Sequence, residues 1–349
     1  MSIPAPLQLD YLSPGHLASL PEAWWQQVLG VVAFGGGPVD APLPDIPAVT
    51  VMTAPLPAHE PPCEIWRAAP PLRSGRLGQL HFRHNEELVF ASIAVREIPA
   101  PSDAAGTGTP LQQATEHAYR DLFGALAKLG FAHLLRVWNY FPQINASQAG
   151  SERYWQFNSA RQQVFARADR ALAGEVPAAC ALGTSDGSPF VLYAIASRNP
   201  GAAIENPRQH SAYRYPPQYG PRAPIFSRGC LAPASAGDML FISGTASIVG
   251  HETVHAGDPA AQTQEALRNI ESLLAAVNRA CGAPARYGLA ALKYKVYLRQ
   301  PQHLALIQQH IRAALPPNTP VLYLLADICR RDLLVEIEAA GGPHAGSPA

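Results

Sequence analysis

The residues Leu88-Val89-Phe90-Ala91-Ser92-Ile93-Ala94-Val95 begin the most regular part of this sequence. Their apolar and partly β-branched side chains predict a buried strand. A predicted helix then starts at Thr109-Pro110, carries leucines at helical spacing and ends at Gly130. This strand and helix open a β-α-β-α-β-β pattern.

The β-α-β-α-β-β pattern occurs twice. The first copy continues with a strand at 133–141, a helix at 153–171 and strands at 178–183 and 190–196. The second copy has strands at 239–243, 292–298, 321–328 and 333–337, with helices at 262–280 and 302–315. In each copy the last two strands are predicted to pair as a hairpin, around Asp186-Gly187 and around Arg330-Arg331-Asp332. The order predicts an α+β fold of tandem units, with mixed sheets that carry helices on one face.

Three parts of the chain are expected. Residues 1–85 form an N-terminal segment that packs on the core as a degenerate third part, with a short helix from Pro21 and a strand at 78–83. Residues 86–200 form the first unit. Residues 201–349 form a linker loop and the second unit.

Composition excludes several classes of function. Lys plus Arg and Asp plus Glu both number 26 among 349 residues, so no basic excess points to nucleic acid or to a membrane surface. The five cysteines are widely spaced and include no Cys-x-x-Cys pair, which favours reduced thiols in a cytoplasmic protein. No signal peptide or membrane-spanning run is recognisable.

The loop 213–229 has an unusual composition. It carries three tyrosines and three arginines among prolines and glycines that oppose a regular helix. Planar cations beside phenols in a stiff loop suit an anionic, partly unsaturated small molecule. The alternative is a surface loop whose tyrosines pack on their neighbours.

His251-Glu252-Thr253-Val254-His255 matches the His-Glu-x-x-His pattern of zinc proteases. That chemistry needs both histidines on one face of a helix. Gly250 and Pro259 flank the motif closely and two of its residues are β-branched, so an irregular loop is expected and no metal site. Asp258 is expected to cap the next helix.

Two glutamates are the strongest candidates for acid–base chemistry. In the strand at 333–337 and just beyond it, alternation places Glu336 and Glu338 on one face, where Ala194 and Ala196 are their expected counterparts in the first copy. A partly desolvated carboxyl has a raised pKa and is suited to general acid catalysis. The alternative is a pair of glutamates on a solvated face. Cys329 lies close by in sequence and is by itself a small apolar residue.

Several blocks resemble the signature of the chorismatases. They are 240–258, 213–229, the stretch 138–145 and the C-terminal region around Cys329 and Glu336. The resemblance implies tandem units of the RidA/YjgF fold. It also implies removal of the enolpyruvyl group of chorismate as pyruvate, with Glu336 as the general acid. Cys329 resembles the residue of members that release 3-hydroxybenzoate, and the whole sequence is most similar to the branch that releases both 3- and 4-hydroxybenzoate. Ala246 lies in the pocket-forming signature.

Chorismate carries two carboxylates, so we expect Arg222, Arg228 or Arg153 to bind them and Tyr213 or Tyr215 to supply a phenol. The expected partner is thus chorismate alone, and no metal or organic cofactor is required. RidA proteins are commonly trimers. The oligomeric state expected for this protein is therefore either a homotrimer or a monomer with internal pseudo-symmetry.

Two other functions remain possible at this stage. RidA-type imine deaminases carry a carboxylate-binding arginine at the start of the penultimate strand, where this chain has Asn318-Thr319-Pro320-Val321. A deaminase is therefore disfavoured. A small-molecule binding module of the same fold stays open, because a fold does not determine a function.

Overall fold

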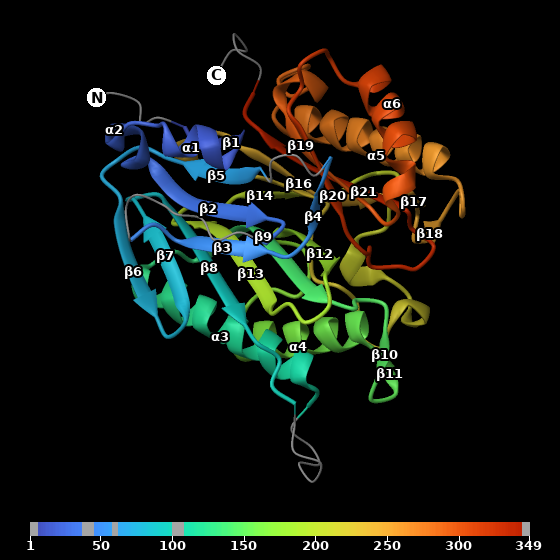
Figure 1. Ribbon diagram of the computed structural model, residues 1–349, viewed down its shortest axis with the longest axis horizontal. Helices are drawn as coiled ribbons and strands as arrows, with labels where there is room; N and C mark the ends of the chain where they lie inside the picture. The colour runs from blue at the N-terminus through green and yellow to red at the C-terminus, as the bar shows by residue number, and fades with distance from the viewer. Residues whose placement is uncertain (1–5, 37–44, 58–61, 100–107, 344–349) are drawn as a thin grey trace.

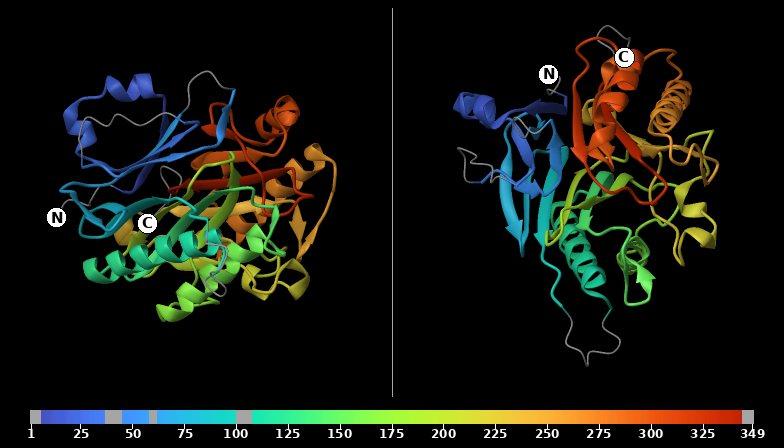
Figure 2. Two further views of the ribbon diagram at one scale, coloured as in Figure 1. Left: turned by 60° about the horizontal axis from the view of Figure 1, so that its bottom comes forward. Right: turned by 45° about the vertical axis from the view of Figure 1, so that its right-hand side comes forward.

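Three main sheets build the protein, and helices cover the outer face of each sheet (Figure 1). The computed structural model describes residues 6–36, 45–57, 62–99 and 108–343. The inner faces of the three sheets meet in one common apolar core, as the turned views in Figure 2 also show. The predicted α+β fold of tandem β-α-β-α-β-β units is confirmed.

The sheet of the first predicted unit has six strands. In spatial order they are β12 (Ala178–Thr184), β9 (His133–Pro142), β13 (Phe190–Ser197), β8 (Leu88–Val95), β7 (Leu80–His84) and β6 (Arg73–Leu77). Helices α3 (Pro110–Leu129) and α4 (Arg153–Arg167) pack on its outer face.

The sheet of the second predicted unit has seven strands. In spatial order they are β14 (Ala202–Ile204), β15 (Gly229–Leu231), β16 (Leu240–Ala246), β21 (Val335–Gly341), β19 (Lys293–Leu298), β20 (Val321–Leu325) and β4 (Ala54–Leu56). Helices α5 (Pro259–Ala280) and α6 (Leu304–Ala314) cover it.

The N-terminal sheet has four strands, in the order β1 (Gln8–Leu12), β5 (Cys63–Arg67), β2 (Val28–Phe34) and β3 (Ala48–Val51). Its outer side is covered by the short helices α1 (Pro14–Ala18) and α2 (Glu22–Trp25). The predicted short helix from Pro21 is present as α2. That helix is only one turn because the β-branched, wholly buried run of β2 follows at once.

The same four-strand arrangement is present in all three sheets. In each, the last strand of the unit pairs antiparallel with the first and second strands, and the third strand pairs parallel with the second. The N-terminal segment is therefore a third copy of this topology with shortened helices. The expected division at residues 85 and 200 stays a prediction, since β6 and β7 join the second sheet and β4 joins the third.

Both predicted hairpins are wrong. β12 and β13 are separated by β9, and β20 and β21 are separated by β19. A turn signal such as Asp186-Gly187 reports a reversal of the chain but not which strand becomes the neighbour. In both units a helix connects the first strand to the second, so these two strands run parallel. The last strand then lies between them and is antiparallel to both.

The helix ends follow local chemistry. Thr109 and Gln112 form a reciprocal capping box at the start of α3, and Gly130 ends that helix with φ of 77°. Asp258 caps α5, as predicted, by accepting a hydrogen bond from the amide of Ala261 at 3.0 Å. Helix α4 ends at Arg167, earlier than predicted, and Asp169 then has a left-handed φ of 51°.

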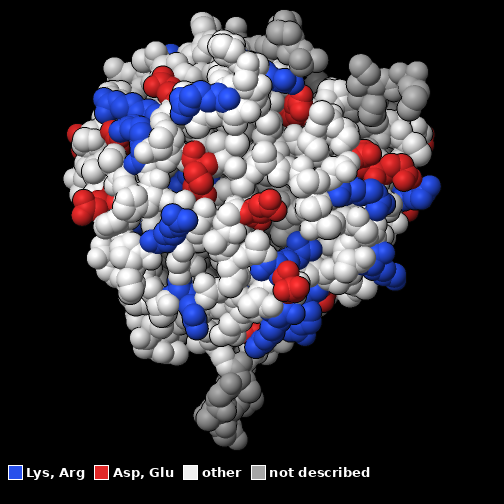
Figure 3. All heavy atoms as spheres, turned by 180° about the vertical axis from the view of Figure 1, so that it is seen from behind, with Lys and Arg blue, Asp and Glu red and all other residues white. Residues whose placement is uncertain are grey.

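The remaining elements are short. They are the strand pairs β10 (Ser147–Gln148) with β11 (Ser151–Glu152) and β17 (Ile248–Val249) with β18 (Glu252–Thr253), and the 3-10 helices η1 (Ala212–Arg214), η2 (Pro217–Tyr219), η3 (Ala234–Ala236), η4 (Leu289–Ala291) and η5 (Pro301–His303). No helix in the described parts of the chain is both long and apolar enough to cross a bilayer. On the face seen in Figure 3, basic and acidic side chains are interspersed, in keeping with the balanced composition.

A cluster of four buried charges lies where the three inner faces meet. Lys295 on β19 contacts Glu64 of the N-terminal sheet at 2.5 Å and Glu338 on β21 at 2.6 Å. Arg136 on β9 contacts the other oxygen of Glu338 at 2.5 Å. Two tryptophan N–H groups complete the cluster: Trp66 donates to Glu64 and Trp138 donates to Glu338. Two positive and two negative side chains thus neutralise each other in the core.

We predict that Lys295→Met destabilises the protein by about 3–5 kcal/mol, because two buried carboxylates lose their shared cation. Lys293→Met is the matched control on the same strand. Its side chain is one-third exposed, so the loss of its Asp10 contact should cost less than about 1 kcal/mol. Urea unfolding of both variants measures the difference. Equal losses would show that the central cluster does not hold the sheets together.

Candidate active site

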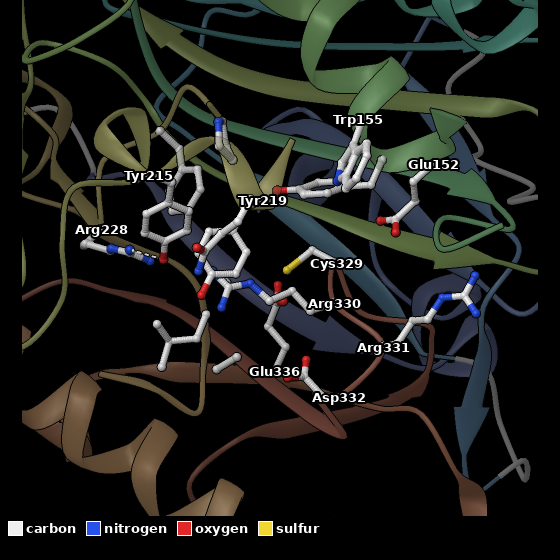
Figure 4. A pocket seen from close by; sticks show the side chains of 17 residues that line it. Glu152, Trp155, Tyr215, Tyr219, Arg228, Cys329, Arg330, Arg331, Asp332 and Glu336 are labelled. Atoms are coloured by element: carbon white, nitrogen blue, oxygen red, sulfur yellow. Dashed lines mark hydrogen bonds between the residues drawn. The ribbon is translucent and has the colours of Figure 1, made fainter. Parts of the chain in front are cut away.

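A cavity of about 310 Å³ opens between the second and third sheets. Its wall comes from the start of α4, the loop 215–228, strand β16, the loop 329–332 and strand β21. Figure 4 shows Glu336 and Cys329 near the centre, with Tyr215, Tyr219 and Arg228 on one side and Glu152 and Arg331 on the other. The side chains therefore converge from segments far apart in sequence.

Two anchors hold the walls of this cavity in place. Ser243 on β16 accepts a hydrogen bond from the amide of Ala179 on β12 at 2.9 Å and donates to the carbonyl of Ser227 at 2.6 Å. Arg299 donates to the carbonyls of Ile328, Arg330 and Leu333, at 2.9 to 3.0 Å. The first anchor joins the two sheets, and the second shapes the loop that carries Cys329.

Glu336 is a buried carboxyl with a raised pKa. It lies on β21 between Ala246 of β16 and Tyr297 of β19. Burial raises its pKa to about 8, and the negative charge of Glu338 acts in the same direction. The positive charges of Arg136 and Arg228 oppose the shift without cancelling it. The carboxyl is therefore protonated at neutral pH and able to donate a proton.

Glu338 takes the opposite protonation state two residues further along the strand. Burial alone would raise its pKa, but the charges of Lys295 and Arg136 lower it overall. Glu338 is thus a fixed negative charge whose oxygens are occupied by the central cluster. One carboxyl is ionised and structural, and its neighbour Glu336 is neutral and faces the cavity.

Gly244 makes room for the Glu336 carboxyl. A Cβ atom at this position would lie 1.9 Å from Glu336 Oε1. The strand β16 also bulges here, because the four residues from Ile242 to Thr245 lie opposite three on β21. The bulge and the missing side chain together let the carboxyl reach the cavity.

Cys329 lies in the loop after β20, which ends at Leu325 and not at Ile328 as predicted. Burial raises the pKa of its thiol to about 12, and the nearby charge of Glu336 adds to the shift. The thiol is therefore protonated at neutral pH, so it acts here as a small polarisable wall and not as a thiolate nucleophile.

Two arginines face the cavity with unused N–H groups. Arg228 donates from Nη2 to the carbonyl of His210 and to the hydroxyl of Tyr215, both at 2.7 Å, and its Nε has no partner within the described chain. Arg330 lies 3.8 Å above the ring of Tyr219 and donates to His251 and Thr253. Its Nη2 is buried and likewise lacks a partner among the described residues. Both cations are suited to receive a carboxylate.

Five of the predicted site residues line this cavity: Glu336, Cys329, Tyr215, Arg228 and Ala246. The other three do not. Arg153 is buried but paired with Glu97 through both of its terminal nitrogens, at 2.5 and 3.0 Å. Arg222 is exposed at the surface, and Tyr213 packs on the core beneath α3 and α4.

Several lining residues were missed, of which Arg330, Tyr219 and Gly244 matter most. Arg330 stood in the sequence as part of a supposed hairpin turn and was not among the predicted site residues. Tyr219 belonged to the tyrosine-rich loop and could have been included with Tyr215. Nothing in the sequence alone signals that Gly244 faces a carboxyl, because that contact depends on strand register.

The expected counterparts of the two glutamates are also corrected. Ala194 and Ala196 face the helices of the second sheet. The residues of β13 that face the common core, as the two glutamates of β21 do, are Val191, Tyr193 and Ile195.

The His-Glu-x-x-His stretch forms the β17–β18 hairpin, not the irregular loop that was expected. His251 lies at its turn, where Nδ1 is 3.3 Å from the hydroxyl of Tyr219, while His255 is exposed with φ of 60°. The two histidines are not one helical turn apart. Within the described residues, no group of three or more potential metal ligands is present.

Comparisons with known proteins agree with this geometry. A family model described as chorismatase FkbO/Hyg5-like, N-terminal, matches residues 64–196. A 3-hydroxybenzoate synthase of Streptomyces hygroscopicus is 38% identical over 290 residues, which cover 81% of this chain and 82% of that protein. A chorismatase of the same organism is 33% identical, covering 90% of this chain and 89% of that protein.

The chain belongs to the chorismatase family. A crystal structure of a chorismatase has a TM-score of 0.85 at 31% identity and covers 98% of this chain and 100% of that one. The resemblance read from the sequence blocks is therefore confirmed over nearly the whole length.

We predict that Gly244→Ala destabilises this chorismatase-family protein by about 1–3 kcal/mol, because the new methyl group overlaps the Glu336 carboxyl. Gly342→Ala is the control, since a Cβ there meets nothing within 4 Å. Thermal and urea unfolding provide the comparison. Identical stabilities would mean that the carboxyl does not lie against Gly244.

We further predict that Glu336 titrates near pH 8. The carbonyl band of its protonated carboxyl should appear in infrared difference spectra of wild type minus Glu336→Gln, and should disappear as the pH rises through about 8. A band already lost by about pH 5 would show an ordinary, solvated carboxyl.

Proposed function

We propose that this protein removes the enolpyruvyl group of chorismate as pyruvate and releases 3-hydroxybenzoate as the main product, with some 4-hydroxybenzoate. The observation that carries the proposal is a neutral Glu336 carboxyl facing a cavity that also presents two arginines. Relatives named chorismatase and 3-hydroxybenzoate synthase support the choice of substrate.

The reaction begins with a proton. Glu336 donates its proton to the methylene carbon of the enol ether, and the ether carbon becomes an oxocarbenium ion. The carboxylate that remains on Glu336 then stabilises this cation electrostatically. The ring hydroxyl on C4 attacks C3 as the bond between C3 and the ether oxygen breaks, which releases pyruvate. The hydroxyl proton returns to the Glu336 carboxylate, and the oxygen bridges C3 and C4 as an epoxide. Opening of the C4–O bond with loss of the C3 proton gives 3-hydroxybenzoate, whereas opening of the C3–O bond with loss of the C4 proton gives 4-hydroxybenzoate. Pyruvate and a hydroxybenzoate together contain all the atoms of chorismate, so no water, redox partner or metal enters the balance.

The arginines give chorismate its orientation. Arg228 and Arg330 each offer an unused N–H group, and Tyr215 and Tyr219 flank them with aromatic surface. We assign carboxylate binding to this pair in place of Arg153 and Arg222, whose side chains point elsewhere. A desolvated carboxylate–guanidinium contact is worth several kcal/mol to binding.

Cys329 and Ala246 are proposed to influence the product. Both side chains are small and line the cavity. Cys329 lies near Glu336 in space, and Ala246 pairs with Glu336 between strands β16 and β21. A neutral thiol beside the ring excludes bulk water and favours aromatisation over release of a dihydroxy-diene acid. Ala246 limits how close the ring comes to β16.

An imine deaminase is not proposed, because the start of β20 carries Pro320 and Val321 where such enzymes have an arginine. A binding module would bind chorismate without releasing pyruvate. Incubation with chorismate and an assay for pyruvate separates it from an enzyme.

We predict that Glu336→Gln lowers turnover by orders of magnitude while chorismate binding is retained, because the amide keeps the shape and lacks the acidic proton. Glu22→Gln, at an exposed position on α2, is the matched control and should be unchanged. Near-normal rates in Glu336→Gln would refute the mechanism.

Chromatography of the organic products, together with the assay for pyruvate, tests Cys329. Cys329→Ala should release pyruvate at a similar rate but change the ratio of organic products, whereas Cys281→Ala, at the end of α5, should change neither. Wild-type turnover that gives only the dihydroxy-diene acid would refute the assignment of Cys329.

A further inference from the structure

A second, smaller cavity of about 40 Å³ lies behind the main one. Glu336, Cys329 and Gly244 line both cavities, together with Tyr154, Pro224 and Phe226, so the inner cavity adjoins the proposed acid. The far side of the inner cavity is formed by Asn158 and Arg161 of α4. Its volume suits one carboxylate group or a single water molecule.

Arg161 is a buried cation without an anionic partner in the described chain. Its side chain is 2% exposed, yet Nε and Nη2 have no hydrogen-bond partner there. The guanidinium carbon lies 5.5 Å from the centre of the Tyr119 ring and 5.1 Å from that of Phe165. These aromatic contacts give a weaker compensation than a carboxylate, and a buried charge without a partner is costly.

The neighbouring groups do not supply the missing negative charge. Among the residues that line the inner cavity, Glu336 is the carboxyl group, and it is neutral at pH 7 because its pKa is about 8. Cys180 also lines the cavity, and burial raises the pKa of its thiol well above its usual value. The side-chain amide of Asn158, whose polar neighbour is the neutral hydroxyl of Tyr154, adds another donor.

We propose that Arg161 and Asn158 form a carboxylate subsite that receives the ring carboxylate of the ligand in the main cavity. The enolpyruvyl carboxylate then meets Arg228 and Arg330 on the opposite side of Glu336. A dicarboxylate is thereby held at both ends with its scissile bond beside the acid. The identity of the ligand at the Arg161 subsite rests on the proposed function.

Calorimetric binding of 3-hydroxybenzoate and of its neutral analogue 3-hydroxybenzamide tests the subsite. Arg161→Met should weaken binding of the acid by about 30-fold or more and leave the amide unchanged. Arg167→Met is the matched control on the same helix, where the side chain is 66% exposed and pairs with Glu116. It should bind both compounds as wild type does. Unaltered binding of the acid by Arg161→Met overturns the proposal.

Thermal unfolding distinguishes a ligand site from a structural arginine. Replacing an unpaired buried cation by an apolar side chain should keep or raise the unfolding temperature without ligand, and should remove the increase that 3-hydroxybenzoate causes. A lowered temperature with the ligand-induced increase intact would show a structural role and overturn the subsite. If Arg161→Met does not fold, Arg161→Lys and Asn158→Leu replace it, and wild-type affinity in both of them overturns the proposal.

The subsite and the proposed function fail in different ways. Wild type that neither converts chorismate nor binds 3-hydroxybenzoate defeats the proposed function. In that case crystals soaked in bromide test the subsite alone: an anomalous peak at the Arg161 guanidinium supports it, and its absence overturns it. In the complex with ligand, water in place of a carboxylate oxygen at Arg161 also overturns it.

Discussion

The four buried charges at the centre of the molecule constrain the rest of the structure. Glu64, Arg136, Lys295 and Glu338 come from three different sheets, and none of them is stable in the core without the others. Their pairing fixes how the three sheets face one another. It also keeps Glu338 ionised, and that charge together with burial keeps the neighbouring Glu336 protonated. The interaction that holds the fold thus also sets the acidity of the candidate catalytic group.

Three copies of one topology do not give three equivalent sites. On the last strand of the second sheet, the residues that face the common core are Val191, Tyr193 and Ile195, none of which is acidic. Only the third sheet combines the carboxyl with the bulge in β16 and with Gly244. A repeated scaffold therefore provides rigid, closely packed walls, and departures from the repeat provide the chemistry.

The proposed site is built on rigid elements and finished by loops. Strands β16 and β21 place Gly244 and Glu336. The loops contribute the more variable parts: Arg299 holds the segment with Cys329 and Arg330 through backbone carbonyls, and Arg228 stiffens the tyrosine-rich loop through Tyr215. Such an arrangement allows the acid to stay fixed while loop residues define which ligand fits.

The sequence by itself determined the order and type of the elements, the inward alternation of Glu336 and Glu338, and the family, because these depend on local periodicity and on short motifs. It also predicted roles for Tyr215, Arg228 and Cys329, which the structure places in the lining of the cavity. Strand neighbours, the partner of each arginine and the contact with Gly244 were decided only by the tertiary structure. The sequence does not distinguish Arg153 from Arg228. In the folded protein Arg153 forms an ion pair with Glu97, whereas Arg228 lines the cavity. Charge pairing across distant segments is a property of the folded chain, so no local pattern reveals it.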